Sequence, residues 1–236
     1  MSSYKKKKKL FDGKTKALYE TDNPEQLILA FKDEFGGESG EVIEKKGEIN
    51  NQVSALLFRY LDGYHIPTHF IHEVGKDAML VRQLNMIALT VTAHYMAFGA
   101  HARRLGVKDG AALQPSIIEF YLKDESPKKT ALDRKDVQSL GLLSTEELHH
   151  IVRIVTKAGV LLQSFFSRRG LMLTSCKFEF GRYKNRLWIG DELSLATCTL
   201  RDAATGESFD WADYRNNLAG LRKAYQALGL RMLTRL

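Results

Sequence analysis

Short alternating runs of apolar and polar residues dominate the first third of the chain, a pattern typical of strands. The segment LFDGKTKALYET, residues 10–21, alternates around Gly13 and predicts two short strands joined at that glycine. Because side chains two apart on a strand point to one face, we expect Lys14 and Lys16 to lie together. Further strands are predicted over residues 27–32, 66–73 and 78–85.

A helical period separates these strand patterns. Apolar side chains recur at helical spacing over residues 47–61, namely Ile49, Val53, Leu56, Leu57 and Tyr60. The stretch GGESGE, residues 36–41, predicts a loop, and residues 87–92 are interpreted as a segment that crosses into the second half. We therefore expect three parts: a basic arm over residues 1–9, an N-terminal lobe over 10–85 and a C-terminal lobe over 86–236.

The second half contains the strongest helix pattern. Residues 124–143 are polar and lysine-rich and predict an exposed connection. Ser144, followed by Glu147 three residues later, has the form of a capping box, and the helix is expected to run to Arg169, before Gly170. Its predicted buried stripe consists of Leu148, Ile151, Val155, Ala158, Leu162, Phe165 and Phe166.

Two further elements are predicted towards the C-terminus. The apolar-rich runs 171–180 and 186–193 flank the turn-like sequence GRYKN and predict a hairpin. The last 28 residues predict a helix whose apolar stripe is Leu218, Leu221, Tyr225 and Leu228.

The composition excludes several classes of protein. With 44% hydrophobic and 27% charged residues, the 236-residue chain has the composition of a globular protein with a sizeable core. No apolar run reaches the roughly 18 residues of a transmembrane helix, so no membrane partner is expected. Cys176 and Cys198 are too few for a disulfide framework or a four-thiolate zinc site. Together with the absence of a secretory signal pattern, this favours a cytoplasmic location.

The net charge of +7 is concentrated in one short segment. Five positive charges form the run Lys5 to Lys9, and the remainder of the chain carries only +2. We interpret the run as a solvated basic arm and do not expect nucleic acid as a partner; an arm that attracts phosphates is the alternative.

The predicted hairpin carries residues that could hold a cation. Glu179 and Lys177 lie on one face of its first strand, and Asp191 lies near the end of the second. Magnesium commonly takes one or two carboxylates together with nucleotide phosphates, whereas the alternative is a pair of surface charges. The element GKTK, residues 13–16, is not a P-loop, but a glycine turn with paired lysines can cover phosphates.

The histidines and cysteines give weaker signals. His94 and His101 are seven residues apart, about two helical turns, but no third ligand stands at metal-binding spacing. His149 and His150 lie in the capped helix and are expected to be structural or surface residues. The cysteines lack C-x-x-C spacing, which argues against thiol catalysis.

Read as a whole, the sequence resembles the SAICAR synthetase family, the ATP-dependent ligases of purine synthesis. The resemblance is carried in order by GKTKALYETDNPEQLILAFKDE (13–34), KKGEINNQVSALLFRYL (45–61), IPTHFI (66–71), EFYLKD (119–124), KFEFG (177–181) and GDELS (190–194). It implies an α+β fold with two lobes, an N-terminal antiparallel sheet lobe similar to a kinase small lobe and a larger α+β lobe, with ATP bound between them. It also suggests a homo-oligomer.

The resemblance also implies roles for individual residues. Lys123 and Lys177 match catalytic positions near the phosphates, and Glu179 and Asp191 match positions that hold Mg²⁺. Arg82 falls where a lysine is usual beside the adenine-binding connection. The full set implied for ATP is Gly13, Lys14, Thr15, Lys16, Leu18, Leu27, Arg82, Leu84 and Met86.

In the family, the carboxylate of the ribotide CAIR is phosphorylated by ATP, and the aspartate amine then displaces phosphate to give SAICAR. Such chemistry depends on positioning and on neutralising phosphoryl charge, and it needs no covalent nucleophile on the protein.

Several positions depart from the family pattern on the side that binds CAIR and aspartate. The arginine and serine of V-V-R-N-x-A-A-G-S correspond to His94 and Ala100, the aspartate of V-D-F-K-L-E-F to Ser175, and the arginine of S-P-D-x-x-R to Thr199. The D-T-S-A-G-D-G loop reads EFGGESG, residues 34–40, and an acidic-Pro motif is replaced at Lys129.

These departures leave three enzymatic or binding interpretations open. The main one is a diverged paralogue that keeps ATP and Mg²⁺ but acts on another nucleotide-like small molecule, with weak or no SAICAR synthesis. The second is a functional SAICAR synthetase of purine synthesis. The third is a non-catalytic nucleotide-binding protein.

Overall fold

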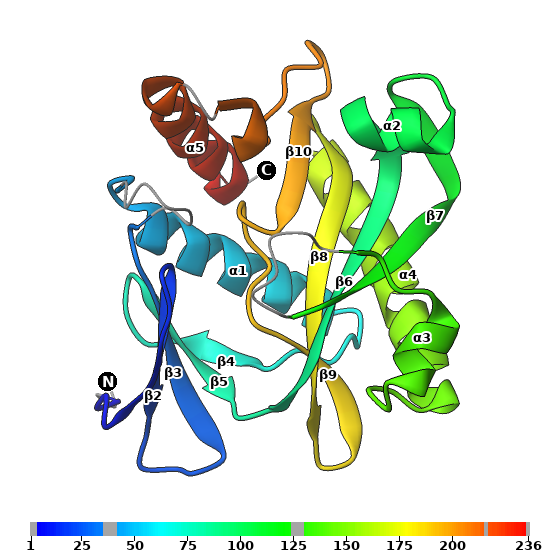
Figure 1. The fold of residues 1–236 in the computed structure, drawn as a ribbon. Coiled ribbons are helices and arrows are strands. Elements are labelled where there is room, and N and C mark those ends of the chain that lie inside the picture. Colours follow the sequence, from blue (N-terminus) through cyan, green and yellow to red (C-terminus); the bar gives the residue numbers. More distant parts are fainter. Residues whose placement is uncertain (1–3, 35–41, 124–129, 215–216, 235–236) are drawn as a thin grey trace. The chain divides into compact units, whose positions relative to one another are not determined.

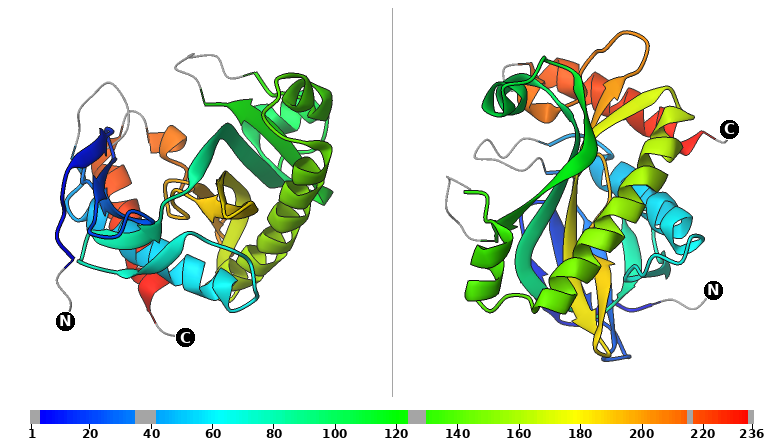
Figure 2. Two further views of the ribbon diagram at one scale, coloured as in Figure 1. Left: turned by 90° about the horizontal axis from the view of Figure 1, so that it is seen from below. Right: turned by 90° about the vertical axis from the view of Figure 1, so that its right-hand side faces the viewer.

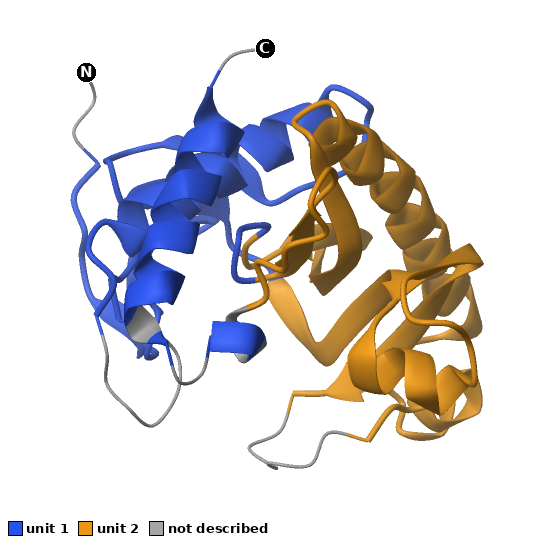
Figure 3. Ribbon diagram, turned by 90° about the horizontal axis from the view of Figure 1, so that it is seen from above, with its two compact units in different colours: residues 1–84, 193–196, 211–236 blue, residues 85–192, 197–210 orange. Residues whose placement is uncertain are grey.

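The structure, a computed structural model, describes residues 4–34, 42–123, 130–214 and 217–234. The chain divides into two compact units (Figure 3). Unit 1 comprises residues 1–84, 193–196 and 211–236, and unit 2 comprises residues 85–192 and 197–210. The C-terminal helix therefore belongs to the same unit as the N-terminal sheet.

Unit 1 contains a five-stranded antiparallel sheet in the order β1-β2-β3-β5-β4 (Figure 1). Its strands are β1 (Lys9–Asp12), β2 (Lys16–Glu20), β3 (Gln26–Phe31), β4 (Phe70–Glu73) and β5 (Ala78–Arg82). The strands predicted from alternation in this region are thereby confirmed, although β4 begins four residues later than predicted.

Two helices complete unit 1. Helix α1 (Lys46–Asp62) confirms the predicted helix and packs against β3, β4 and β5, where Phe58 stacks on Phe70 with ring centroids 6.1 Å apart. Helix α5 (Leu218–Leu233) packs against α1, and the Tyr225 hydroxyl donates a hydrogen bond to Asn50 in this contact. Three residues of its predicted stripe are buried, Leu221, Tyr225 and Leu228. The Leu218 side chain lies outside the described residues. A 3₁₀ turn, η1 (Trp211–Tyr214), precedes α5.

Unit 2 contains the second antiparallel sheet, in the order β10-β8-β6-β7, with β9 paired to β8 (Figure 1). Its strands are β6 (Asn85–Ala97), β7 (Ala111–Leu122), β8 (Leu171–Tyr183), β9 (Arg186–Gly190) and β10 (Cys198–Asp202). Strands β8 and β9 confirm the predicted hairpin, and its turn places Lys184 and Asn185 at positive φ. Two sheets with separate helices agree with the expected α+β class.

Helix α4 (Thr145–Ser167) covers one face of the unit 2 sheet (Figures 1 and 2). The predicted capping box is present, with Ser144 and Glu147 bonded reciprocally. Gly159 packs so closely on Tyr95 of β6 that an added Cβ would lie 2.6 Å from the Tyr95 hydroxyl. The buried side chains of the covered sheet face are Leu89, Val91, Ala93, Tyr95, Phe120, Cys176, Phe178, Phe180, Cys198 and Leu200.

The prediction for residues 87–92 was wrong. They form the middle of β6, a 13-residue strand that pairs with β7 on one side and β8 on the other. Ile87, Leu89 and Val91 are buried at every second position, which is the period of a strand with one covered face.

Other differences concern short elements. Part of the expected connection over residues 124–143 is helix α3 (Arg134–Ser139), capped by Asp133, while residues 124–129 lie outside the described residues. Helix α2 (Gly99–Leu105) and strands β7 and β10 were not predicted. The loop predicted at residues 36–41 also lies outside the described residues. No helix in the described part of the chain combines the length and apolarity needed to cross a membrane.

Candidate functional site

Strand alternation gathers polar side chains on the face of the unit 2 sheet opposite to α4. Lys177 of β8 lies opposite Thr92 of β6, which in turn lies opposite Glu119 of β7. We call this surface the polar face; it consists of Thr90, Thr92 and His94 of β6, Glu119 and Tyr121 of β7, Ser175, Lys177 and Glu179 of β8 and Thr199 of β10.

One part of the polar face combines lysines with carboxylates. Lys123, just after β7, donates a hydrogen bond from Nζ to Glu179 Oε2 at 2.5 Å, and exposed Lys177 lies two residues before Glu179 on β8. Asp191 follows Gly190, which pairs with Glu179 in the register of β8 and β9. Lys123, Lys177, Glu179 and Asp191, the lysine–carboxylate group, offer oxygen ligands for a hard cation beside two positive charges for phosphates.

The backbone of Asp191 has an uncommon conformation. Its φ of 57° lies in the left-handed region, which costs free energy for a residue other than glycine. Such backbone conformations cluster at ligand-binding and catalytic sites. The conformation turns the chain directly after β9, next to the position of Glu179 in the sheet.

A second part of the polar face is rich in nitrogen ligands. His94 Nε2 donates to Glu119 Oε2 at 3.0 Å, and the His94 ring stacks on that of His101 with centroids 4.1 Å apart. His94 lies on β6 and His101 on α2, so the helical spacing suggested by the sequence does not exist. The strand pairing of β6 with β7 supplies the third ligand, Glu119, that the sequence spacing had not revealed.

Two neighbours complete this histidine–glutamate group of His94, His101 and Glu119. Arg104 donates from Nη2 to Glu119 Oε1 at 2.5 Å and to His101 Nδ1 at 3.0 Å. Tyr121 donates its hydroxyl hydrogen to Glu119 Oε2 at 2.6 Å. Both carboxylate oxygens of Glu119, a residue only 8% exposed, are therefore hydrogen-bonded.

These contacts shift the pKa values of the group. Burial is the main cause that lowers the pKa of His94, and the neighbouring His101 ring lowers it further. Burial also lowers the pKa of His101, and the Arg104 charge is the second cause. Burial favours the protonated form of Glu119, but hydrogen bonds from Tyr121 and Arg104 outweigh it and lower its pKa. Burial and the bond to Glu119 raise the pKa of Tyr121 to about 12. Near neutral pH the group therefore has neutral imidazoles beside an ionised carboxylate.

The other altered positions in this part of unit 2, Ala100, Ser175 and Thr199, are uncharged. Ser175 donates a hydrogen bond to the hydroxyl of Thr199 at 3.0 Å across β8 and β10. Ala100, on α2, lines a pocket of about 340 Å³ together with the histidine–glutamate group, Arg104, Tyr121 and Ala131. Four of the altered positions, His94, Ala100, Ser175 and Thr199, are thus brought to one sheet face and its adjoining pocket.

The residues implied for ATP lie mainly in unit 1. The Gly13 N–H donates to the Lys16 carbonyl at 2.9 Å and closes the turn between β1 and β2, which carries Lys14 and Thr15. Lys32 Nζ donates to the Gly13 carbonyl at 2.9 Å and supports the turn from β3. The predicted turn at Gly13 is therefore present. Lys14 lies in the turn and only Lys16 lies in β2, so the expectation that both lysines share one face of a strand was wrong.

The other implied ATP residues are dispersed. Leu18 of β2 pairs with Leu29, and Leu27 of β3 pairs with Val81. Arg82 Nη1 donates to the carbonyls of Thr68 and Phe70 at 3.3 and 3.1 Å. Leu84 is the last residue of unit 1 before the chain crosses over, and Met86, in β6, belongs to unit 2.

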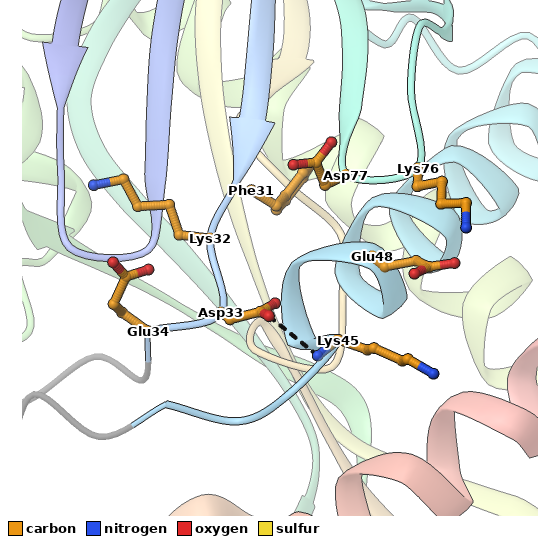
Figure 4. Close-up of a pocket in the computed structure, with 8 residues that line it drawn as sticks. All are labelled: Phe31, Lys32, Asp33, Glu34, Lys45, Glu48, Lys76 and Asp77. Atoms are coloured by element: carbon orange, nitrogen blue, oxygen red, sulfur yellow. Dashed lines mark hydrogen bonds between the residues drawn. The ribbon is translucent and has the colours of Figure 1, made fainter.

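Unit 1 also contains a cavity that sequence reasoning missed. It measures about 670 Å³ and is lined by Phe31, Lys32, Asp33, Glu34, Lys45, Glu48, Lys76 and Asp77 (Figure 4). The Asp33 carboxylate accepts hydrogen bonds from the backbone N–H groups of Lys45 and Gly47 at 3.2 and 2.8 Å and so caps α1. The helix terminus is therefore already bound by an acidic side chain, and the cavity lining contains three lysines and four acidic residues.

Comparison with known proteins places the chain in a class of ligases. The model of SAICAR synthetase matches residues 9–231. The phosphoribosylaminoimidazole-succinocarboxamide synthase of Acidithiobacillus ferrooxidans is 35% identical over 226 residues, 94% of each chain, and that of Prosthecochloris aestuarii is 36% identical over 227 residues, 95% of this chain and 97% of the relative. The chain belongs to the SAICAR synthetase family.

Solved structures agree with this assignment. The crystal structure of the synthase from Ehrlichia chaffeensis has a TM-score of 0.88 and 30% identity, covering 97% of this chain and 100% of that chain. A SAICAR synthetase in complex with ADP has a TM-score of 0.87 and 30% identity, covering 94% of this chain and 97% of that chain. The two-lobe α+β fold implied by the resemblance is thereby confirmed.

Proposed function

We propose that this protein is an ATP- and Mg²⁺-dependent ligase that forms SAICAR from CAIR and aspartate. The observation that carries the proposal is the lysine–carboxylate group, held on the polar face by β-sheet pairing and by the 2.5 Å contact of Lys123 with Glu179. Family membership over nearly the whole chain supports it. The relatives that match are synthases by name, and one related structure holds ADP.

The proposed chemistry has two steps. A carboxylate oxygen of CAIR attacks the γ-phosphorus of ATP and releases ADP, and the aspartate nitrogen then attacks the acyl carbon and releases phosphate. Lys123 and Lys177 would offset the negative charge of the transferred group, and Glu179 and Asp191 would hold Mg²⁺. Mg²⁺ supplies further charge neutralisation on the phosphate oxygens. The Gly13 turn, with Lys14 and Lys16, is the proposed phosphate-covering element.

A second candidate function is a ligase of the same type acting on another carboxylate substrate. The observation that favours it is the lack of positive charge at the altered positions. Ser175 and Thr199 are uncharged and hydrogen-bond to each other, and His94 is hydrogen-bonded to Glu119. A substrate phosphate would meet fewer free cations there than in the usual family pattern. This interpretation keeps the lysine–carboxylate group and changes only the acceptor.

The deciding experiment measures ADP and SAICAR separately. Purified protein is incubated with CAIR, aspartate, ATP and Mg²⁺; SAICAR is detected by mass and ADP by a coupled assay. Lys177→Ala should abolish both products, whereas Lys184→Ala, which removes a lysine at the β8–β9 turn, should leave them unchanged.

Each outcome has a distinct meaning. SAICAR formation at many turnovers supports the main proposal. ADP release only with another carboxylate and amine supports the second candidate. Folded protein that binds ATP but releases no ADP with any acceptor would overturn both and favour a non-catalytic nucleotide-binding protein.

A further inference from the structure

Three ligand-bearing side chains converge beside the 340 Å³ pocket of unit 2. One ligand atom from each of His94, His101 and Glu119 lies within 4.8 Å of the others. We propose that these residues bind one divalent transition-metal ion of the zinc type. The inference concerns a site separate from the lysine–carboxylate group and does not depend on which reaction the protein catalyses.

The ligand set selects the kind of ion. Two imidazoles and one carboxylate form a three-residue set known from zinc sites that keep a fourth position open. Imidazole nitrogen suits Zn²⁺, Co²⁺ or Ni²⁺, whereas Mg²⁺ prefers oxygen ligands and keeps several waters. The histidine–glutamate group should therefore bind zinc-type ions even when Mg²⁺ is in excess.

The hydrogen-bond pattern leaves places for the ion. His94 Nε2 and Glu119 Oε2 share one hydrogen, and both atoms can ligate a metal ion. The ion can take the place of this hydrogen once the proton has moved to His94 Nδ1. His101 Nε2 is buried and has no hydrogen-bond partner within the described residues. Because His101 Nδ1 accepts a hydrogen bond from Arg104, Nε2 carries the ring hydrogen, and that proton must move to Nδ1 before Nε2 can ligate an ion. Tyr121, bonded to Glu119, would serve as an outer partner that orients the carboxylate.

Coordination requires two local movements. The imidazole rings of His94 and His101 are stacked with 16° between their planes, and they must open from this stack for nitrogens of both rings to reach one ion. Arg104, bonded to both Glu119 and His101, must move away because a guanidinium cannot ligate and repels the ion. The Arg104 side chain is 52% exposed and is therefore free to swing into solvent.

The test uses Co²⁺ as a spectroscopic probe. Metal-depleted, untagged full-length protein is titrated with Co²⁺ in excess Mg²⁺, and the visible absorption of low-coordinate Co²⁺ is recorded. We expect saturation at one equivalent and displacement by Zn²⁺. His101→Phe keeps a ring for stacking but removes both nitrogens, and it should weaken binding by at least about 100-fold.

Two matched variants give opposite expectations. His149→Ala removes an exposed histidine of α4 in the same unit and should leave binding unchanged. Arg104→Gln removes the competing charge and should tighten binding about tenfold. Circular dichroism checks that each variant is folded, and His101→Ala replaces His101→Phe if the latter is not.

Failure is equally clear. Folded wild-type protein without one-equivalent saturation would overturn the proposal, as would a His101 variant that binds Co²⁺ as tightly as the wild type. Weaker binding by Arg104→Gln would also contradict it, because Arg104 would then support the ion and not compete with it.

Discussion

The two faces of the unit 2 sheet are built from the same strands but carry different kinds of side chain. On β8, Cys176, Phe178 and Phe180 are almost completely buried on the face that contains the α4 contacts, while Lys177 and Glu179 alternate with them on the polar face. The covered face is apolar except for Arg182 of β8 and the Tyr95 hydroxyl. The polar face carries every unit 2 residue to which we assign chemistry except Lys123 and Asp191, which adjoin it, and His101 and Arg104 of α2.

This division explains how the family pattern can change at a few positions without loss of the fold. His94, Ser175 and Thr199 lie on the polar face, where their side chains contribute little to the core. Because a strand side chain reaches only one face, substitutions there alter chemistry and leave the packing under α4 intact. Substitutions on the covered face should instead lower the free energy of unfolding and leave kcat of the folded molecules unchanged.

The largest effect is expected for Asp191→Asn. Loss of one carboxylate ligand should reduce kcat for ADP formation by about 10³-fold, because Mg²⁺ charge neutralisation would be impaired. Co²⁺ binding at the histidine–glutamate group should stay unchanged, which separates the two groups of the polar face. Steady-state kinetics at saturating ATP and a Co²⁺ titration measure both. Unchanged kcat would show that Asp191 is not a metal ligand.

His94→Arg is expected to have the next largest effect. An arginine restores a guanidinium at the altered position, and a charge-assisted hydrogen bond of about 1.5–3 kcal/mol to substrate phosphate would lower KM for CAIR roughly 10- to 100-fold. The same variant should lose Co²⁺ binding. His149→Arg, which adds an equal charge on α4, is the control for a general electrostatic effect. A KM that rises for CAIR would favour a substrate without a phosphate at this position.

The comparison of faces also shows what could be predicted from the sequence. Helix α4 and the β8–β9 hairpin were predictable because their period and capping signals are local, such as Ser144 with Glu147. Strand β6 was not predicted, although buried side chains recur at every second position from Ile87 to Ala97, with Thr92 buried in addition.

The histidine–glutamate group could not be predicted from local sequence. His94 and His101 suggested a helical spacing, but the proposed ligands come from β6, α2 and β7. The register that places Thr92 opposite Glu119 brings His94 and Glu119 together. Arg104 likewise approaches Glu119 across 15 residues of sequence. By contrast, Lys177 and Glu179 were predictable as a pair because two residues of one strand share a face.

On the covered face, Gly159→Ala should destabilise the protein by about 2 kcal/mol. Alanine favours a helix over glycine by about 1 kcal/mol, but the new Cβ would lie 2.6 Å from the Tyr95 hydroxyl, so overpacking outweighs propensity. Urea unfolding measures the effect, with exposed Val160→Ala as the control on the same helix. The kcat of the folded fraction should not change; a stabilised variant would mean that Tyr95 moves aside at little cost.

The smallest effect, about 1 kcal/mol at neutral pH, is expected for Glu147→Gln. Glu147 accepts hydrogen bonds from Arg182 Nε at 2.6 Å and Nη2 at 3.0 Å, and from the Ser144 N–H, and thereby ties the start of α4 to β8. The hydrogen bond from Arg182 is the main cause that lowers the Glu147 pKa below 4.5. The ionised carboxylate therefore stabilises the fold above that value and loses this contribution as the pH falls through the lowered folded-state pKa.

Urea unfolding of wild type and variant from pH 7 down to pH 3 should show their difference shrinking below about pH 4.5. Glu146→Gln, an exposed neighbour in the same turn, controls for the loss of one charge, and a difference that persists unchanged at low pH would mean that Glu147 acts by packing and not by its charge.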